Sequence, residues 1–347
     1  MKALVKTYDK RGLWLEEVDV PVISDNEVLV RVKKVSICGT DVHIYDWNEW
    51  AQNTIQIGMT VGHEYVGEIV EIGSDVKSLK IGDIVSGEGH LVCGECRNCR
   101  AGRYHLCRNT KGIGVNINGC FAEYVKVPAV NIWKTKPNVN EELYAIYDPF
   151  GNAVHTALSF DILGEDILIT GAGPIGVMAA LICQHIQGRH VVLTDVNPLR
   201  IDLAKRLGVK HVINTKETTV ADYQKVLGLR EGFDVGLEMS GNERALNDMI
   251  TNMKHGGKIA MLGIQDSNAS VNWNDVVFKC LHIKGIYGRE MFETWYKMEM
   301  LIDTGLDIGK IITHHYKFEE FEKGFEVMFS GEAGKVILDL EYLWEGK

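Results

Sequence analysis

The sequence predicts an α/β protein in which a doubly wound parallel sheet is combined with a mostly-β region. Six short apolar runs alternate with segments that can form helices; the runs are 167–169, 191–193, 212–213, 235–237, 259–262 and 283–286. This alternation is typical of a parallel sheet covered by helices on both faces. Residues 1 to about 150 contain short β-like runs separated by glycines and no long helical period, which indicates a twisted barrel or sandwich.

The outer segments suggest how the regions are connected. Near the start, Val28, Val30 and Val32 alternate with Leu29, Arg31 and Lys33, which predicts a strand. In the middle, Asn197–Pro198 and Gly208 bound a helix, PLRIDLAKRLG. The last residues contain an amphipathic helix candidate, MFETWYKMEMLIDTG, and a β-like run, KVILDLEYL. We expect the tail to return to the first region, so that 1–150 and 291–347 form one domain and 151–290 another.

Composition and charge limit the function. The chain has 347 residues, 46% of them hydrophobic, a size that suits about two to three domains. Its 37 basic and 47 acidic residues give a net charge of −10, which argues against a nucleic-acid partner. The longest apolar stretch, Ile175 to Cys183, is too short to cross a bilayer, and MKALVKTYDK lacks the apolar core of a signal peptide. We expect a cytoplasmic protein with no membrane partner.

A glycine-rich turn predicts a dinucleotide site. DILITGAGPIG follows an apolar strand, opens a helix and places three glycines in GxGxxG spacing: Gly171, Gly173 and Gly176. Small residues there let backbone N–H groups approach a pyrophosphate. Asp195 ends the next strand and can accept the ribose hydroxyls, which favours NAD over NADP, although Arg200 weakens the charge argument. The alternative is an ordinary tight turn with a capping Asp.

Four clustered cysteines predict a structural zinc site. They have the spacing Cys-x2-Cys-x2-Cys-x7-Cys and are Cys93, Cys96, Cys99 and Cys107. Four thiolates close a tetrahedral site, whereas an iron–sulfur motif would place its fourth ligand after three residues and before proline. The scattered Cys120, Cys183 and Cys280 are interpreted as small buried hydrophobes.

A second ligand set predicts a catalytic metal. Cys38 lies in ICGTDVH, and His63 and Glu64 lie in VGHEYVGEIVEIG. A Cys, a His and a carboxylate can bind zinc and leave a position for water or substrate. Each piece alone is unremarkable, since a lone Cys is usually core and a His–Glu pair usually lies on the surface. Their combination with a dinucleotide turn strengthens the catalytic interpretation.

These motifs, in this order, resemble the zinc-dependent medium-chain alcohol dehydrogenase superfamily. The resemblance rests on ICGTDVH, GHEYVGEIVEIG, the four-cysteine lobe and GAGPIG, and it covers essentially the whole chain. Longer blocks are similar to the branch that oxidises L-threonine: DVHIYDWNEW, SGEGH, DPFGNAVHTALSFD, FDVGLEMSG and KGIYGREMFETWYKM. The resemblance implies a Rossmann-type NAD-binding domain and a GroES-like catalytic domain.

The resemblance also implies roles for single residues around the metal. Cys38 and His63 match the catalytic zinc ligands, and Glu64 matches a carboxylate that can enter or leave the zinc shell. Asp148, in DPFGN, stands where relatives carry a third ligand, often glutamate. Because aspartate is shorter, we expect it to act through water or in the proton pathway.

Further roles concern the proton and the cofactor. Thr40 and His43 match a hydroxyl and an imidazole that carry the substrate proton to solvent. The positions that match cofactor contacts, in addition to the glycines, are Ile175, Asp195, Arg200, Leu262, Gly263, Ile264, Ile286 and Tyr287. His90, directly after SGEG, could face the substrate or lie on the surface.

The implied reaction is NAD-dependent oxidation of L-threonine at C3 to 2-amino-3-oxobutanoate. Zinc would polarise the hydroxyl, the relay would remove its proton, and hydride would pass to NAD. The resemblance further implies two zinc ions per chain and a homotetramer. Two alternatives remain: a polyol or 2,3-diol dehydrogenase of the same superfamily, and a non-catalytic protein that binds NAD and zinc.

Overall fold

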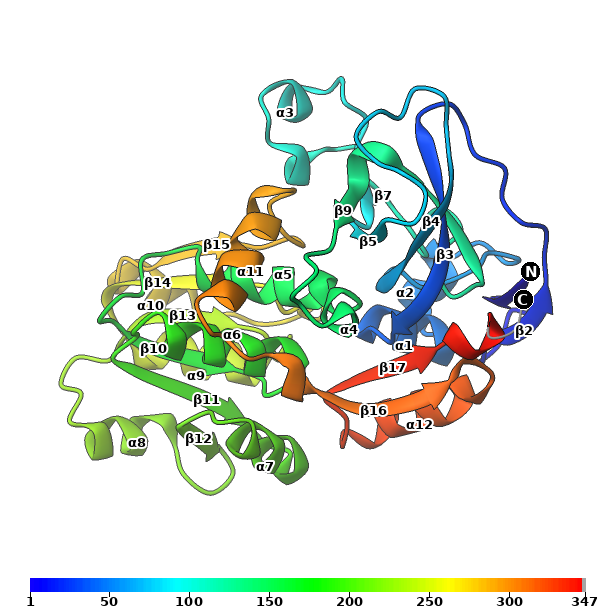
Figure 1. The fold of residues 1–347 in the computed structure, drawn as a ribbon. Coiled ribbons are helices and arrows are strands. Elements are labelled where there is room, and N and C mark those ends of the chain that lie inside the picture. Colours follow the sequence, from blue (N-terminus) through cyan, green and yellow to red (C-terminus); the bar gives the residue numbers. More distant parts are fainter. Residues whose placement is uncertain (345–347) are drawn as a thin grey trace. The chain divides into compact units, whose positions relative to one another are not determined.

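The computed structural model describes residues 1–344 and divides the chain into two compact units (Figure 1). The first unit contains Met1–Asp148 and the chain from Ile312 onward, and the second contains Pro149–Ile311. The expected boundary at 291 is therefore wrong. Helix α11 (Glu293–Asp303) belongs to the second unit, where Trp295 and Met298 on its apolar face are fully buried. An amphipathic pattern predicts such a helix, but it does not say which core the helix will cover.

The second unit is built on a six-stranded parallel sheet within the described residues. Its order is β12-β11-β10-β13-β14-β15, which confirms all six predicted runs. The strands are β10 (Asp166–Thr170), β11 (His190–Asp195), β12 (His211–Asn214), β13 (Phe233–Glu238), β14 (Met253–Met261) and β15 (His282–Gly285). The chain runs outward from β10 to β12 and then restarts at β13 on the other side of β10. Ligands bind at such a switch point, beyond the carboxyl ends of the strands.

Helices join these strands and pack on the sheet (Figure 1). They are α6 (Pro174–His185), α7 (Pro198–Arg206), α8 (Val220–Leu227), α9 (Glu243–Asn252) and α10 (Trp273–Phe278). The predicted start of α7 is confirmed, because the Asn197 side chain accepts a hydrogen bond from the backbone N–H of Leu199. Pro174 occupies the first turn of α6, where a missing N–H costs nothing.

The first unit is built on a seven-stranded sheet. Its path is β16-β17-β3-β4-β5-β9, with β8 also paired to β3. The strands are β3 (Glu27–Ser36), β4 (Tyr65–Ile72), β5 (Ile84–Gly87), β8 (Tyr124–Pro128), β9 (Ile132–Lys134), β16 (Ile312–Lys317) and β17 (Lys335–Asp339). β17 pairs antiparallel with β3, so the two ends of the chain meet in one sheet.

Shorter elements complete this unit. They are β1 (Lys2–Val5), β2 (Trp14–Glu17), α1 (Gly39–Asp46), α2 (Glu49–Thr54), β6 (His90–Leu91), α3 (Arg97–Arg100), β7 (Lys111–Gly112), α4 (Glu141–Tyr144) and α12 (Phe321–Ser330), while α5 (Tyr147–Ala157) spans the unit boundary. No helix in residues 1–344 combines the length and apolarity needed to span a membrane.

The scattered cysteines divide into two kinds. Cys120 and Cys183 are fully buried, as expected for small hydrophobes. Cys280 is exposed, so that interpretation was wrong for this residue. It follows α10 in a left-handed conformation with φ of 49°, and this turn carries its side chain outward, away from the core.

Candidate active site

The second ligand set comes together in the first unit. Cys38 is the N-cap of α1, and His63 and Glu64 directly precede β4. Their thiol, imidazole and carboxylate ligand atoms all lie within 4.8 Å of one another. These three donor types suit zinc, and three protein ligands leave one position for water or substrate. The structure thus brings these predicted ligands together.

Unpaired buried atoms in this cluster support a metal. Glu64 Oε1, His63 Nδ1 and Asp41 Oδ1 are buried and have no hydrogen-bond partner among the described residues. Leaving such atoms unpaired is costly unless a cation or a bound molecule satisfies them. The residues present therefore fit a zinc ion.

Asp41 was missed from the sequence. Its Oδ2 accepts a hydrogen bond from the backbone N–H of Cys38 at 2.9 Å, and its Oδ1 lies 3.7 Å from His63 Nδ1. Burial raises the pKa of Asp41 to about 6, although the nearby His63 acts in the opposite direction. The sequence signal that could have identified Asp41 is its position three residues after the N-cap of α1, where a carboxylate can accept a hydrogen bond from the backbone N–H of the cap residue.

Lys335 was also missed. Its buried ammonium, on β17, donates to Glu64 Oε2 and to the carbonyl of Ile37, each at 2.7 Å. Burial disfavours this charge, but the Glu64 carboxylate and other anionic groups leave the pKa of Lys335 raised. Lys335 thus occupies Oε2 of Glu64, while Oε1 is buried without a hydrogen-bond partner among the described residues. A lysine that opens a buried apolar strand is the sequence signal that could have found it.

The two relay candidates lie on the helix that Cys38 caps. Thr40 and His43 are three residues apart on α1 and therefore share a face of the helix. His43 is exposed, and its Nδ1 lies 2.9 Å from Nδ2 of Asn48. Burial lowers the pKa of His63, but the charges of Asp41, Cys38 and Asp148 together leave it raised. Asp148, at the start of α5, lies outside the three-residue ligand cluster. His90, on β6, lies 3.1 Å from the buried carboxylate of Glu88 through its Nδ1.

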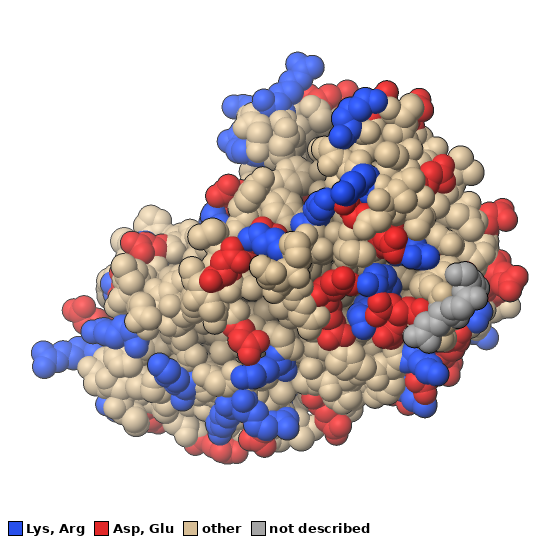
Figure 2. Space-filling model, in the orientation of Figure 1, with Lys and Arg blue, Asp and Glu red and all other residues tan. Residues whose placement is uncertain are grey.

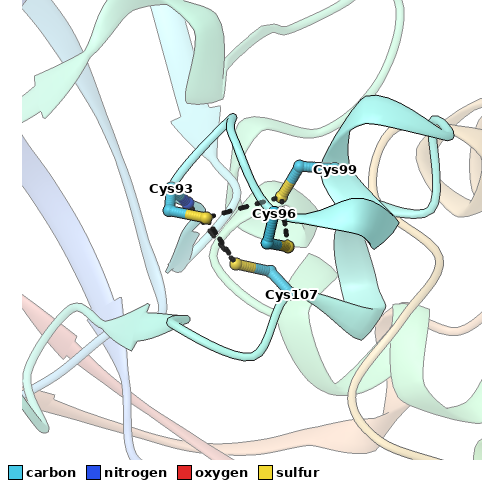
Figure 3. A group of neighbouring side chains, drawn as sticks. All are labelled: Cys93, Cys96, Cys99 and Cys107. Carbon is cyan, nitrogen blue, oxygen red and sulfur yellow. Dashed lines mark hydrogen bonds between the residues drawn. The ribbon is translucent and has the colours of Figure 1, made fainter.

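The four lobe cysteines form a second group of ligand atoms (Figure 3). Sulfur–sulfur distances are 3.5 Å for Cys96–Cys99 and Cys93–Cys107 and 4.0 Å for Cys93–Cys99. All four are free thiols. A tetrahedral zinc with Zn–S bonds of ~2.3 Å requires sulfurs about 3.8 Å apart, so the lobe fits that ion.

The lobe thiols lie in different surroundings. Hydrogen bonding, led by the Cys99 backbone, lowers the pKa of Cys96 to about 6, whereas burial raises the pKa of Cys99 to about 12. Basic side chains gather on the lobe around α3 (Figure 2); they include the exposed Arg97, Arg100, Arg103 and Arg108. Since four thiolates and one Zn²⁺ carry two net negative charges, these guanidinium groups offset the charge of a loaded site.

The dinucleotide turn borders a pocket of about 730 Å³ in the second unit. Of the predicted cofactor residues, Gly171, Gly173, Asp195 and Arg200 line it, at the carboxyl ends of β10 and β11 and the start of α7. Gly171 has a φ of +91°, which favours glycine, and Ile175 lies in the first turn of the helix that follows. A Cβ on Gly176 would lie 1.9 Å from the Gly171 carbonyl oxygen, so only glycine allows this close helix–strand contact.

Asp195 links two parts of this pocket. Its Oδ2 accepts from the backbone N–H of Ala172 in the glycine-rich turn, at 2.7 Å. Its Oδ1 accepts from the N–H groups of Val196 and Asn197. The carboxylate is therefore held facing the pocket before any ribose arrives. Lys216 and Arg244 also line the pocket and were missed, because no spacing rule identifies them.

The remaining predicted cofactor residues follow strands at the same edge of the sheet. Leu262, Gly263 and Ile264 follow β14, Ile286 and Tyr287 follow β15, and none of these five lines the 730 Å³ pocket. Gly263 packs against the buried side chain of Glu238, at the end of β13. No sequence motif identified Glu238. The Glu238 carboxylate accepts hydrogen bonds from Ser240, Gly241 and Gln265, and it thus holds the loop after β13 against the loop after β14.

Comparisons with known proteins agree with this arrangement. Residues 24–137 match the alcohol dehydrogenase GroES-like domain, and residues 174–304 match the zinc-binding dehydrogenase family. An L-threonine 3-dehydrogenase from Aliivibrio fischeri (strain MJ11) is 60% identical over 341 residues, which cover 98% of this chain and 99% of that protein. An L-threonine 3-dehydrogenase from Vibrio cholerae serotype O1 (strain M66-2) is 59% identical, with the same coverage.

Solved structures share the fold. The alcohol dehydrogenase TADH from Thermus sp. ATN1 has a TM-score of 0.89 at 27% identity and covers 98% of this chain and 99% of its own. The chain therefore belongs to the L-threonine 3-dehydrogenase family of the zinc-dependent medium-chain alcohol dehydrogenases.

Proposed function

We propose that this chain is a zinc- and NAD-dependent enzyme that oxidises L-threonine at its C3 hydroxyl to 2-amino-3-oxobutanoate. The observation that carries the proposal is near-full-length identity of 60% to L-threonine 3-dehydrogenases, in a chain that keeps the Cys38–His63–Glu64 cluster. A non-catalytic relative would have no need of an open metal site, so the cluster favours an enzyme.

The metal cluster prepares the substrate hydroxyl. Cys38 and His63 would hold the metal, and Glu64 can add Oε1, which is buried without a hydrogen-bond partner among the described residues, whereas Oε2 accepts from Lys335. Zinc supplies a Lewis acid that lowers the pKa of a hydroxyl, and NAD accepts the hydride. Asp41 orients the cluster through the Cys38 backbone and faces His63.

The relay removes the proton. Thr40 passes the proton of the substrate hydroxyl to His43, which is exposed and can release it to water. The resemblance places Asp148 in the proton pathway or at the metal through water; in the structure its charge adds to those of Asp41 and Cys38 in raising the pKa of His63. His90 is a candidate contact for the ammonium or carboxylate of the substrate.

The second unit holds the cofactor. The glycine turn at the N-terminus of α6 would receive the pyrophosphate, and Asp195 would accept hydrogen bonds from the adenosine ribose hydroxyls. Arg200 lines the same pocket, and Ile175, in the first turn of α6, would flank the pyrophosphate. The loops that follow β14 and β15 would border the nicotinamide. In the first unit, the four lobe cysteines would hold a second, structural zinc.

The assembly proposed is a cytoplasmic homotetramer. β15 ends the six-stranded sheet, and all four of its residues are exposed. An exposed edge strand presents unpaired N–H and C=O groups, which a second copy can satisfy by strand pairing. Pairing of this edge joins two chains, and the tetramer itself is proposed from the family resemblance. Sedimentation of the purified chain tests this state, and a monomer or a dimer at micromolar concentration would refute the tetramer.

A substrate panel with NAD tests the function. We expect kcat/KM for L-threonine to exceed the values for D-threonine, 2,3-butanediol and sorbitol by at least about 100-fold, because polar groups built for a zwitterion stay unpaired with a neutral diol. Faster oxidation of butanediol or sorbitol would replace the substrate assignment with the polyol or diol alternative. No oxidation of any alcohol by the zinc-loaded chain would reject the enzyme itself.

A further inference from the structure

The proton relay has a neighbour that none of the motifs identified. Asn48 lies at the junction of α1 and α2, and its Nδ2 is 2.9 Å from His43 Nδ1. The backbone folds Asn48 back toward His43, because the N–H groups of Trp47 and Asn48 both point at the His43 carbonyl oxygen, at 3.0 and 3.4 Å. The two helices are adjacent in the first unit (Figure 1).

The turn before Asn48 is firmly held. Trp47 adopts a left-handed conformation with φ of 58°, and its indole N–H donates to the Asp9 carboxylate. The buried ammonium of Lys6 lies 4.1 Å from the centroid of the same indole ring. Since Trp47 is nearly buried, these contacts fix the backbone from which the Asn48 side chain starts.

A second hydrogen bond fixes which end of the Asn48 amide faces His43. Asn48 is the N-cap of α2, and its Oδ1 accepts from the backbone N–H of Ala51 at 3.0 Å. A flipped amide would place its NH₂ group against that N–H and lose the cap. The helix therefore orients the amide so that Nδ2, which can only donate, points at the imidazole.

We infer that Asn48 is a positioning residue that selects the tautomer of His43 and disfavours its protonated form. Because Nδ2 donates to Nδ1, Nδ1 must carry a lone pair, and the single proton of the neutral ring must sit on Nε2. The imidazolium has a proton on both nitrogens, so its formation opposes the Asn48 contact. The relay proton can enter the ring only at Nδ1, so the Asn48 amide must release that nitrogen as the proton arrives. The ring then gives its Nε2 proton to water and returns to the neutral form, and the Asn48 contact keeps the doubly protonated ring short-lived.

No described carboxylate competes for His43. The nearby acids on α1 and α2 are Asp41, Asp46 and Glu49, and none of them lies within 4.0 Å of the imidazole. Asp46 is paired with Arg11, and Asp41 faces His63. Glu322 and Glu326 of α12 act on Tyr45, on a different side of α1. The other ring contact of His43 is the edge of Trp50, at 6.4 Å between centroids.

The test compares two variants that both keep the helix cap, Asn48→Ser and Asn48→Asp. Serine and aspartate are both good N-caps, but the serine hydroxyl is too short to reach His43, whereas the aspartate carboxylate would accept a hydrogen bond from it. Thus Asn48→Ser removes the donor and Asn48→Asp replaces it with an anionic acceptor. A role confined to capping predicts the same behaviour for both variants.

Two readouts decide the inference. The first is the nitrogen-15 chemical shifts of the His43 ring in the zinc-loaded enzyme, assigned by comparison with His43→Gln. The unmodified chain should show the proton on Nε2, Asn48→Ser should show a mixture of the two neutral tautomers, and Asn48→Asp should show the proton on Nδ1. The acid limb of kcat/KM should move to higher pH by about one unit in Asn48→Asp, which is roughly a tenfold loss below neutral pH, and by less in Asn48→Ser. Protonated Nδ1 in the unmodified chain, or identical profiles for the two variants, would overturn it.

This inference rests on the relay in the proposed function, but the two can fail separately. If His43→Ala leaves kcat unchanged, His43 is not the relay base, and the proposed function loses that step. The nitrogen shifts do not depend on turnover, so they still decide whether Asn48 sets the tautomer.

Discussion

The two groups of candidate metal ligands in the first unit are built in opposite ways. The lobe takes four identical ligands from residues 93–107, and all four sulfurs lie within 4.8 Å of one another. Backbone N–H groups already donate to the Cys107 sulfur. The other cluster takes three different ligands from two segments, and Lys335, which is 271 residues from Glu64 in sequence, holds one of them.

This difference separates a closed site from an open one. Four thiolates satisfy a tetrahedral metal completely, so the lobe has no position for substrate. The Cys38 cluster has three ligands and buried polar atoms without partners, which leaves both a coordination position for substrate and an electrostatic demand for a cation. Local sequence is thus sufficient to build a structural site, whereas the reactive site needs tertiary contacts.

The largest expected effect comes from Cys38→Ser. Removing this ligand should lower kcat by at least about 10³-fold, because the Lewis acid accounts for several kcal/mol of transition-state stabilisation. The melting temperature should change little, since the fold does not depend on the open site. Steady-state kinetics and calorimetry on the same preparation measure both. Activity within tenfold of the unmodified chain would remove Cys38 from the catalytic centre.

Cys96→Ser should show the reverse behaviour. Structural zinc binding contributes folding free energy directly, so loss of one thiolate should unfold the lobe and lower the melting temperature of the first unit. The remaining folded enzyme should keep its KM for substrate. Metal analysis should find one zinc fewer, and full retention of both zinc and stability would contradict the structural role.

Lys335→Met tests the contact that links the reactive cluster to the end of the chain. It leaves the Glu64 carboxylate buried without its cation, which should cost about 3–5 kcal/mol in the free energy of unfolding. The double variant with Glu64→Gln should recover much of this loss. If denaturant unfolding shows additive losses instead, the two groups are not coupled.

Asp195→Ser tests the dinucleotide pocket, which, like the four-cysteine lobe, is built from residues close together in the sequence. The substitution removes a ribose acceptor and a charge that repels the 2′-phosphate of NADP. The ratio of kcat/KM for NAD to that for NADP should fall by about 10- to 100-fold. Equal use of the two cofactors by the unmodified chain would refute the role of Asp195.

Sequence patterns predicted what depends on neighbours in the chain. The six parallel strands and the α7 cap follow from periodicity and helix-start signals, and the four lobe cysteines follow from their spacing. The Cys38, His63 and Glu64 set follows from the residue types and from the family resemblance, and the structure brings these residues together. Asp41, Lys335 and Glu238 escaped because their importance comes from partners in other segments. The boundary at 291 failed for the same reason, since α11 shows an apolar face but not its destination.

Graded removal of metal from the purified enzyme tests the contrast between the two sites most directly. Metal analysis should find two zinc ions per chain. A chelator should first remove one zinc together with activity, while circular dichroism stays unchanged, and only then remove the second zinc, together with unfolding of the lobe. One zinc per chain, iron in the lobe, or simultaneous loss of both metals, activity and fold would contradict the account.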